Sequence, residues 1–401
     1  MKTVGIVCEY NPIHTGHLRQ IEYAKSMGAE RIVCVMSGNY TQRGEMAIAE
    51  KYSRALCAKE CGADLILELP FPYCSMSGEF FARAAIYILG SVGVDTVCFG
   101  HECEDISTLY RAAEIFESQA FKNALSPAGS TGVAKGFFNA YESASGEKYD
   151  LGSNDILGAY YILAAKKLFP NMKFLPIKRN GADYKQKDLT ENQYPSATAI
   201  RKYIEENGFD DLPDGYMHSK ALDILKKLNA DGLCPADMSN ISSDVLTMLR
   251  MNTKEQLTAR ATDISGGGNT ILDDGGIVSR LISASYKCND IDSLLSDAYC
   301  SKFTDSRVRR VLLYTLFGVS DIFKENLPDY TNLLCASTVG REHLSSIRKS
   351  KSFNIVTKPA DAPKDSPVYK VSRLADMLYA SAMPKKQDAQ YFLLRSPYIE
   401  K

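Results

Sequence analysis

Short apolar runs alternate with helical patterns over the first hundred residues. Runs of strand length, rich in Val, Ile, Leu and Cys and without polar alternation, occupy residues 3–8, 31–36, 64–69 and 95–99. Such runs are typical of parallel strands that are buried on both faces. Helical periodicity fills residues 17–27, 48–61 and 78–92. This order predicts an α/β fold, a Rossmann-like domain with a parallel sheet whose ligands bind at the carboxyl ends of the strands.

Polar residues collect where each of these runs ends, at 9–17, 37–45, 70–73 and 100–102. Any one of them is also typical of an ordinary loop, but together they outline one rim of the sheet. A further helix at 154–168 and a strand at 173–177 precede 18 residues, 178–195, that show no periodicity. A stretch of that length in a compact domain indicates a functional loop or lid.

The pattern changes beyond residue 208. Long helical patterns dominate, for example at 219–229, 276–286 and 306–317. The chain is too long for one ordinary core. We therefore expect a nucleotidyltransferase-like domain at 1–208 and a mainly α-helical domain at 209–401.

The first rim segment contains His14-Thr15-Gly16-His17 at a strand-to-helix junction. A spacing of three places both imidazoles on one face of the starting helix, and Gly16 lets a phosphate approach the backbone. The free N–H groups and the dipole of the helix start favour an anion. The alternative is a purely structural role, in which a histidine beside a turn only caps the helix. Two histidines around a glycine at this junction favour a nucleotide-phosphate site instead.

A second anion site is predicted at the end of the long loop. Ser196 is placed to cap a helix that runs to about residue 207, and Thr198 and Arg201 follow in its first turns. Hydroxyls, amide N–H groups and an arginine at one helix start are suited to phosphate.

Composition narrows the class of protein without naming a reaction. Hydrophobic residues make up 45% and charged residues 24% of the chain, and the net charge is −1, which excludes a globally polycationic nucleic-acid coat. No leader peptide or membrane-length apolar run is visible, and the 11 cysteines include no C-x-x-C pair. We expect a cytoplasmic protein with no membrane association and without structural zinc.

Two basic clusters stand out in the second half. They comprise Lys302, Arg307, Arg309 and Arg310, and then Arg341, Arg348, Lys349, Lys351 and Lys358. A solvated helix face explains such clusters. Contact with an RNA backbone is the alternative, supported by the nearby aromatic residues Phe303, Tyr314 and Phe353.

The two motifs resemble the paired signatures of the HIGH-superfamily nucleotidyltransferases, which attack the α-phosphate of ATP and release pyrophosphate. Segments 5–17, 36–45, 64–70 and 152–155 look specifically like the tRNA(Met) cytidine acetate ligase family. That family activates acetate with ATP and acetylates N4 of the wobble cytidine of elongator tRNA(Met). The resemblance is close over about residues 1–205. The family's E-G-L-x-N-R and K-R-Y-T stretches are replaced here by D-G-G-I-V-S-R at 274–280 and S-K-F-T at 301–304.

The resemblance implies a set of ATP contacts, namely Val7, Glu9, Tyr10, Asn11, Pro12, His14, Gly16, His17, Gln20, Gly100, Asn154 and Arg179. Gly100 ends a predicted strand, where a side chain would obstruct the adenine, and Asn154 offers a donor and an acceptor. Lys178 is a weaker candidate than Arg179. Gln42 and Arg43 are candidates for the acetate or cytidine pocket.

Adenylation of acetate requires stabilisation of charge that moves toward the departing pyrophosphate. His14 and His17 are the candidates for the α-phosphate and the bridging oxygen. Ser196 and Thr198 are assigned to the outer phosphates, and Arg201 or Arg179 to the leaving group. Mg²⁺ is expected with the triphosphate on charge grounds, although no motif fixes its ligands. His101 and Glu102 are positional guesses for a base.

Two other functions remain open at this stage. A small-molecule nucleotidyltransferase would use the same two motifs without RNA, although the additional helical half is unnecessary for such a substrate. An RNA-binding or scaffolding protein with a remnant nucleotide site is disfavoured by the intact motif residues.

Overall fold

The computed structural model describes residues 3–125, 133–179, 196–350 and 353–401, and this part of the chain contains one sheet in the order β5-β4-β1-β2-β3-β6-β7, with β8 beside β6. Its strands are β1 (Thr3–Cys8), β2 (Arg31–Ser37), β3 (Leu65–Leu69), β4 (Thr96–His101), β5 (Lys173–Lys178), β6 (Thr331–Ala336), β7 (Ile355–Val356) and β8 (Tyr398–Ile399). Strands β1 to β5 pair in parallel, as predicted, whereas β6 runs antiparallel to β3. The carboxyl ends of β1, β2, β4 and β5 therefore share one edge.

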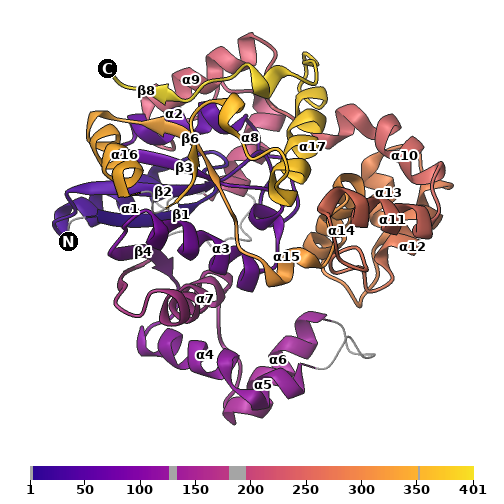
Figure 1. Cartoon of the computed structure of the whole chain (residues 1–401), viewed down its shortest axis with the longest axis horizontal. Helices are drawn as coiled ribbons and strands as arrows, with labels where there is room; N and C mark the ends of the chain where they lie inside the picture. Colours follow the sequence, from indigo (N-terminus) through magenta and orange to yellow (C-terminus); the bar gives the residue numbers. More distant parts are fainter. Residues whose placement is uncertain (1–2, 126–132, 180–195, 351–352) are drawn as a thin grey trace.

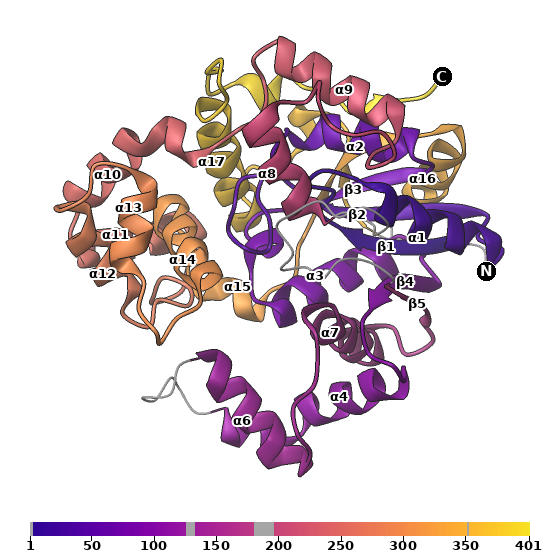
Figure 2. The same ribbon diagram turned by 180° about the vertical axis from the view of Figure 1, so that it is seen from behind.

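Helices cover both faces of the sheet (Figures 1 and 2). One face is covered by α1 (Thr15–Ser26), α2 (Lys51–Glu60), α8 (Ala197–Asn207) and α9 (Ser219–Ala230). The other is covered by α3 (Gly78–Ser91), α7 (Ser153–Leu168) and α16 (Thr338–Ser350). Within β2, Val33 and Val35 enter the second core, and Ile32 and Cys34 enter the first. This alternation explains why the strands are apolar at every position.

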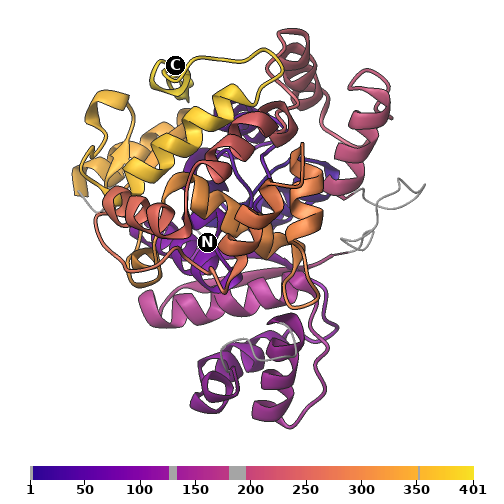
Figure 3. The same cartoon turned by 90° about the vertical axis from the view of Figure 1, so that its right-hand side faces the viewer.

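The remaining helices form two groups beside the sheet (Figure 1). The smaller group comprises α4 (Ser107–Glu117), α5 (Gln119–Ala124) and α6 (Val133–Ser145). The larger comprises α10 (Ser242–Arg250), α11 (Lys254–Ser265), α12 (Ile277–Ser285), α13 (Ile291–Ala298), α14 (Asp305–Phe317) and α15 (Ile322–Glu325). Helix α17 (Pro367–Ser381) lies between the larger group and the sheet (Figure 1), and Figure 3 shows the larger group from its outer side. Short 3₁₀ turns occur at Tyr73–Ser75, Met238–Ile241, Pro359–Asp361 and Tyr391–Leu393.

The expected helical domain at 209–401 requires a correction. Its predicted helices are present as α9, α12 and α14, within two residues of the expected bounds. However, β6, β7 and β8 also belong to this half, and β6 extends the sheet of the first half through β3. Residues Leu333, Leu334 and Cys335 are fully buried there because both faces of the added strand are covered. The second half is mainly helical, as expected, but it also contributes strands to the sheet of the first half.

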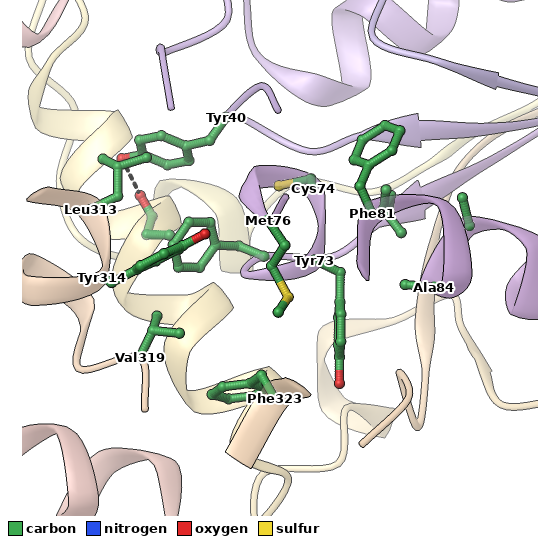
Figure 4. Packing of buried hydrophobic residues seen from close by; sticks show 14 of the residues in the cluster. Tyr40, Tyr73, Cys74, Met76, Phe81, Ala84, Leu313, Tyr314, Val319 and Phe323 are labelled. Atoms are coloured by element: carbon green, nitrogen blue, oxygen red, sulfur yellow. Dashed lines mark hydrogen bonds between the residues drawn. The ribbon is translucent and has the colours of Figure 1, made fainter. Parts of the chain in front are cut away.

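A continuous apolar core joins the larger helical group to the sheet (Figure 4). Tyr40, Tyr73 and Met76 come from the segments that follow β2 and β3, and they meet Tyr314 and Phe323 from the helical group. The Tyr314 hydroxyl donates to the Ser75 carbonyl across this junction at 2.5 Å. Such packing holds α14 firmly against the loop after β2. Among the described residues, no helix is long and apolar enough to cross a membrane.

Candidate nucleotide site

Helix α1 begins inside the H-x-G-H motif, and His14 is its N-cap. The Gly16 N–H donates to His14 Nδ1 at 3.1 Å, and the His14 N–H donates to His17 Nδ1 at 3.3 Å. The two rings lie with their centroids 3.8 Å apart. The capping role that the sequence offered as an alternative is therefore real, and it is filled by one nitrogen of each ring.

That cap leaves the other nitrogen of each imidazole for a ligand. Because both Nδ1 atoms accept from backbone N–H groups, we infer that the proton of each neutral ring is on Nε2. Burial lowers the pKa of His14 to about 3, assisted by the positive charge of Arg179. Burial also lowers the pKa of His17, with smaller contributions from His14 and Arg179. The motif thus offers two neutral Nε2–H donors at pH 7.

The turn between β1 and α1 is held by buried contacts. Tyr10 adopts φ +46°, an uncommon conformation for a side-chain-bearing residue, and its ring packs on that of His17 at 5.0 Å. The Asn11 side-chain oxygen accepts from the Ile48 N–H at 2.7 Å, and Asn11 precedes Pro12 through a cis peptide bond. These predicted contact residues thus shape the path of the backbone toward the histidines.

The second motif reaches the same turn from the other side. Ser196 caps α8 by accepting from the Ala199 N–H at 3.0 Å. Arg201 donates to the Asn11 carbonyl at 2.8 Å and lies 3.5 Å from the Thr198 hydroxyl. Two motifs about 180 residues apart in the chain are therefore adjacent in space, and the start of α8 is directed to the same edge of the sheet.

Gly100 and Arg179 lie together at the ends of β4 and β5. A Cβ atom at Gly100 would lie 3.1 Å from the Arg179 side chain, so Arg179 fills the space that the missing side chain leaves. The Arg179 N–H donates to the His101 carbonyl at 2.9 Å. The positive charge of Arg179 also helps to lower the pKa values of His14 and His17.

The other predicted ATP contacts occupy varied positions at this edge. Gln20 on α1 donates to the Cys98 carbonyl at 2.9 Å, and Val7 is half-buried on β1. The Asn154 amide donates to the Glu102 carboxylate at the start of α7. Lys178 pairs with Glu104, which agrees with its weaker ranking. Residues 180–195, most of the predicted loop, lie outside the described part of the chain.

Glu9 is a half-buried carboxylate behind the phosphate edge. It accepts from the Gln42 N–H at 2.6 Å, and burial raises its pKa despite that bond. Gln42 uses its side chain to donate to the Met76 carbonyl at 3.1 Å, so this residue supports the loop. Sequence reasoning placed Gln42 as a pocket residue but gave no role to Glu45, the last residue of segment 36–45. It also overlooked Arg54, which donates to the Ser37 carbonyl at 3.0 Å, because Arg54 lies outside every segment that resembles the family.

His101, Cys103 and Asp155 are the one group in the described residues whose ligand atoms lie close enough to share a metal ion, within 4.8 Å. The Asp155 carboxylate already has hydrogen-bond partners, since its Oδ1 accepts from the N–H groups of Glu102 and Cys103 at 2.7 and 3.1 Å. His101 Nδ1 lies 3.2 Å from the Cys103 carbonyl. These contacts join the segment after β4 to the start of α7, and a sulfur and imidazole pair is not what Mg²⁺ prefers.

The first basic cluster is only partly available to RNA. Arg310 is buried and donates to the Gln42 carbonyl at 3.3 Å, while Arg309 pairs with Glu45 at 3.2 Å. Phe303 and Tyr314 are also buried, so the expectation that they support RNA contact is wrong. They face the apolar core instead because α14 is covered by protein over most of its length.

The two stretches that depart from the family pattern meet at the start of α14. Arg307 donates to the Asp273 carbonyl at 3.2 Å and stacks on Phe303 with 5.2 Å from its guanidinium carbon to the ring centre. A Cβ atom at Gly275 would lie 2.8 Å from the Arg307 guanidinium. Residues 274–280 and 301–304 therefore meet around Arg307, two residues before Arg309, which pairs with Glu45.

The second basic cluster lies on α16 and near β7. Arg341 donates to the Glu400 carbonyl at 3.2 Å and Arg348 to the Thr357 hydroxyl at 2.6 Å. Lys351 lies outside the described residues. The described arginines thus have local partners, in agreement with the solvated-face interpretation.

Comparison with known proteins defines the class to which this site belongs. The family described as HIGH Nucleotidyl Transferase matches residues 1–392. The tRNA(Met) cytidine acetate ligase of Acetivibrio thermocellus is 33% identical over 92% of this chain and 91% of its own length. The crystal structure of apo Thermotoga maritima TmcAL has a TM-score of 0.87 and 27% identity, covering 100% of both chains.

A second Thermotoga maritima structure, TmcAL bound with alpha-thio ATP, has a TM-score of 0.83 and 26% identity, again over 100% of both chains. The fold and the two motifs define a nucleotidyltransferase of the HIGH class. Because the relatives match over nearly their whole length, the chain belongs to the tRNA(Met) cytidine acetate ligase family.

Proposed function

We propose that the protein uses ATP to activate acetate and transfers the acetyl group to a cytidine of tRNA. The observation that supports this most strongly is the meeting of His14, His17 and Arg201 at one edge of the sheet, in a chain that matches its ligase relatives over about nine-tenths of their length. Acetate is a poor acyl donor until one of its oxygens becomes part of a good leaving group. Adenylation supplies that leaving group without a covalent protein intermediate.

In the first step, an acetate oxygen attacks the α-phosphorus of ATP, and the bond to the oxygen that bridges toward the β-phosphate breaks. The electron pair leaves with pyrophosphate, and acetyl-adenylate remains. His14 and His17 donate Nε2–H to oxygens of the α-phosphate and the bridging position. Since both rings are neutral, the compensating charge comes from Arg179, Arg201 and the start of α8.

In the second step, N4 of the cytidine attacks the acetyl carbonyl, AMP departs, and N4 loses a proton. His101 is poorly placed as the base, because it is buried at the end of β4 with its Nδ1 against the Cys103 carbonyl. Glu102 already accepts from Asn154. Release of the proton to AMP phosphate or to water is therefore the simpler route.

Mg²⁺ accompanies the triphosphate in this proposal. Among the described residues, the one candidate metal cluster is His101, Cys103 and Asp155. It does not suit Mg²⁺, because two of its ligands are an imidazole and a thiol and its carboxylate already accepts backbone hydrogen bonds. The ion would be held by phosphate oxygens and water, as is usual for Mg²⁺.

The proposal names the wobble cytidine of elongator tRNA(Met) as the acceptor. It is supported by the relatives, which are tRNA(Met) cytidine acetate ligases, and by the arginines at the start of α14. This part of α14 lies next to the loop after β2, so an RNA bound there would be close to the phosphate edge.

The test is incorporation of radiolabelled acetate into bulk tRNA by the purified protein, with and without ATP. Digestion of the labelled tRNA then locates the modified nucleoside. ATP-dependent label in N4-acetylcytidine is the expected result. Pyrophosphate release with a phosphorylated metabolite, and no labelled RNA, would instead identify a small-molecule nucleotidyltransferase.

A further inference from the structure

One carboxylate, that of Glu45, connects the phosphate edge to the larger helical group. Its Oε2 lies 3.4 Å from Arg201 of α8, and its Oε1 lies 3.2 Å from Arg309 of α14. The two arginines therefore share a single negative charge, and each uses a different oxygen of it. Neither sequence motif contains Glu45.

The loop that carries Glu45 is fixed to both neighbours. The Thr41 N–H donates to the Glu45 carbonyl at 2.9 Å, which closes a tight turn. Gly44, at φ +76°, approaches α14 so closely that a Cβ atom there would lie 2.7 Å from the backbone nitrogen of Arg310. The Glu45 carboxylate is thus held at the junction of two elements that have their own anionic ligands in the proposed function.

In the proposed function, each arginine also meets a phosphate, which binds it more strongly than a carboxylate that is shared with a second arginine. Arg201 bonds the Asn11 carbonyl three residues before His14, so the triphosphate of ATP arrives beside it. The Arg309 side chain is 36% exposed and lies near the start of α14, where contact with RNA is proposed. A phosphate oxygen forms a charge-assisted bond with either guanidinium.

We propose that Glu45 couples the two anions antagonistically, an inference that rests on the proposed function. When triphosphate engages Arg201, the whole Glu45 carboxylate is left for Arg309, which then releases it less readily to RNA. Reciprocity requires that RNA at Arg309 returns the carboxylate to Arg201 and weakens the hold on the triphosphate or pyrophosphate. RNA therefore binds best after pyrophosphate has left, when acetyl-adenylate is ready for transfer.

The test measures tRNA affinity of the full-length protein by fluorescence anisotropy at one fixed salt concentration. The Kd for bulk tRNA is compared without nucleotide, with AMP and with the non-hydrolysable α,β-methylene analogue of ATP. In the unmodified protein we expect the analogue, but not AMP, to weaken tRNA binding about fivefold. In Glu45→Gln the effect of the analogue should fall below about twofold, and tRNA should bind more tightly without nucleotide.

Glu60→Gln is the matched control, because Glu60 is also shared by two cations, Lys59 at 3.2 Å and Lys220 at 3.0 Å, away from the site. It should keep the full effect of the analogue. Arg309→Gln provides a second variant if Glu45→Gln is poorly folded, and it should also lose the effect. An equal effect in the unmodified protein and in either coupling variant would overturn the proposal, as would the absence of tRNA binding.

Acetate-dependent exchange of pyrophosphate into ATP separates this inference from the proposed function. Exchange that persists in Glu45→Gln, together with loss of the analogue effect, supports both. Exchange with an unchanged analogue effect refutes only the coupling. No exchange in the unmodified protein refutes the adenylation itself.

Discussion

Two regions of the molecule differ in how their charged groups are arranged. One is the phosphate edge of the sheet, and the other is the contact between the segment at 38–51 and the C-terminal helices. At the edge, the positive charge of Arg179 acts on two buried imidazoles, and burial together with this charge lowers the pKa of both. At the contact, Lys51 lies between Glu68 and Asp376 at 2.9 and 2.8 Å, and Arg310 bonds a carbonyl. The first region is prepared to receive charge, and the second has already neutralised it.

The difference teaches how to distinguish a binding arginine from a structural one in this molecule. Arg310 and Arg309 are adjacent in sequence, yet the former is buried against Gln42 and the latter is half-exposed beside a shared carboxylate. A basic cluster in a sequence therefore contains residues with different roles.

Replacement of Lys51 by Met should have the largest effect. It leaves Glu68 and Asp376 buried without their cation, at an expected loss of about 3–5 kcal/mol in the free energy of unfolding. Chemical denaturation measures this loss. The control Lys59→Met removes a cation that pairs with two more exposed carboxylates and should cost less than about 1 kcal/mol. Equal losses would show that the buried cluster is not special.

Replacement of His17 by Ala should reduce acetate-dependent pyrophosphate exchange about 10²- to 10³-fold, because a donor to the developing charge is removed. The Kd for tRNA should not change. His343→Asn, a half-buried histidine on α16, is the control and should retain exchange. Retained exchange in His17→Ala would break the assignment of the phosphate edge.

Replacement of Arg310 by Met should lower the free energy of unfolding by about 1–3 kcal/mol, because the buried guanidinium and its hydrogen bond to the half-buried Gln42 carbonyl are lost. Arg309→Met removes a more exposed pair and should cost less than about 1 kcal/mol. Thermal unfolding of both variants distinguishes them. A larger loss in Arg309→Met would reverse the roles given to the two arginines.

Acid should destabilise the protein partly through the two motif histidines. Their pKa values are lowered in the folded state, so between the ordinary value of 6.5 and the folded value, about 3 for His14, the unfolded chain binds more protons. Their contribution is complete above pH 6.5 and is lost as the pH falls, by at most about 1.4 kcal/mol per pH unit for each. Unfolding of the double variant His14→Gln, His17→Gln should therefore depend less steeply on pH between 6.5 and 4. Equal slopes would mean that the rings are not buried in neutral form.

Local sequence signals predicted the first half well. The apolar runs and the two motifs identified β1 to β5 and α1, since each depends on residues that are neighbours in the chain. The contact partners of the segment at 38–51 were not predictable in this way. The Asn39 side chain donates a hydrogen bond to Asp376 at 2.8 Å although the two residues are 337 positions apart. No pattern within either segment predicts the other.

The strand β6 was missed for a related reason. Its six residues fit a buried strand, but they follow a long helical region, and only their antiparallel pairing with β3 fixes their place. The position of Arg310 depended on the same long-range packing. Composition showed that the cluster was basic but not which side chains would be buried.

The pairing of β6 with β3 also sets an order of events during synthesis. The edge of β3 leaves the ribosome roughly 260 residues before its partner strand does. At about 5–20 residues per second, this edge is incomplete for tens of seconds, with unpaired N–H and C=O groups. The nascent chain therefore passes through a period in which the catalytic half is largely made but its sheet is still open to pairing with another chain.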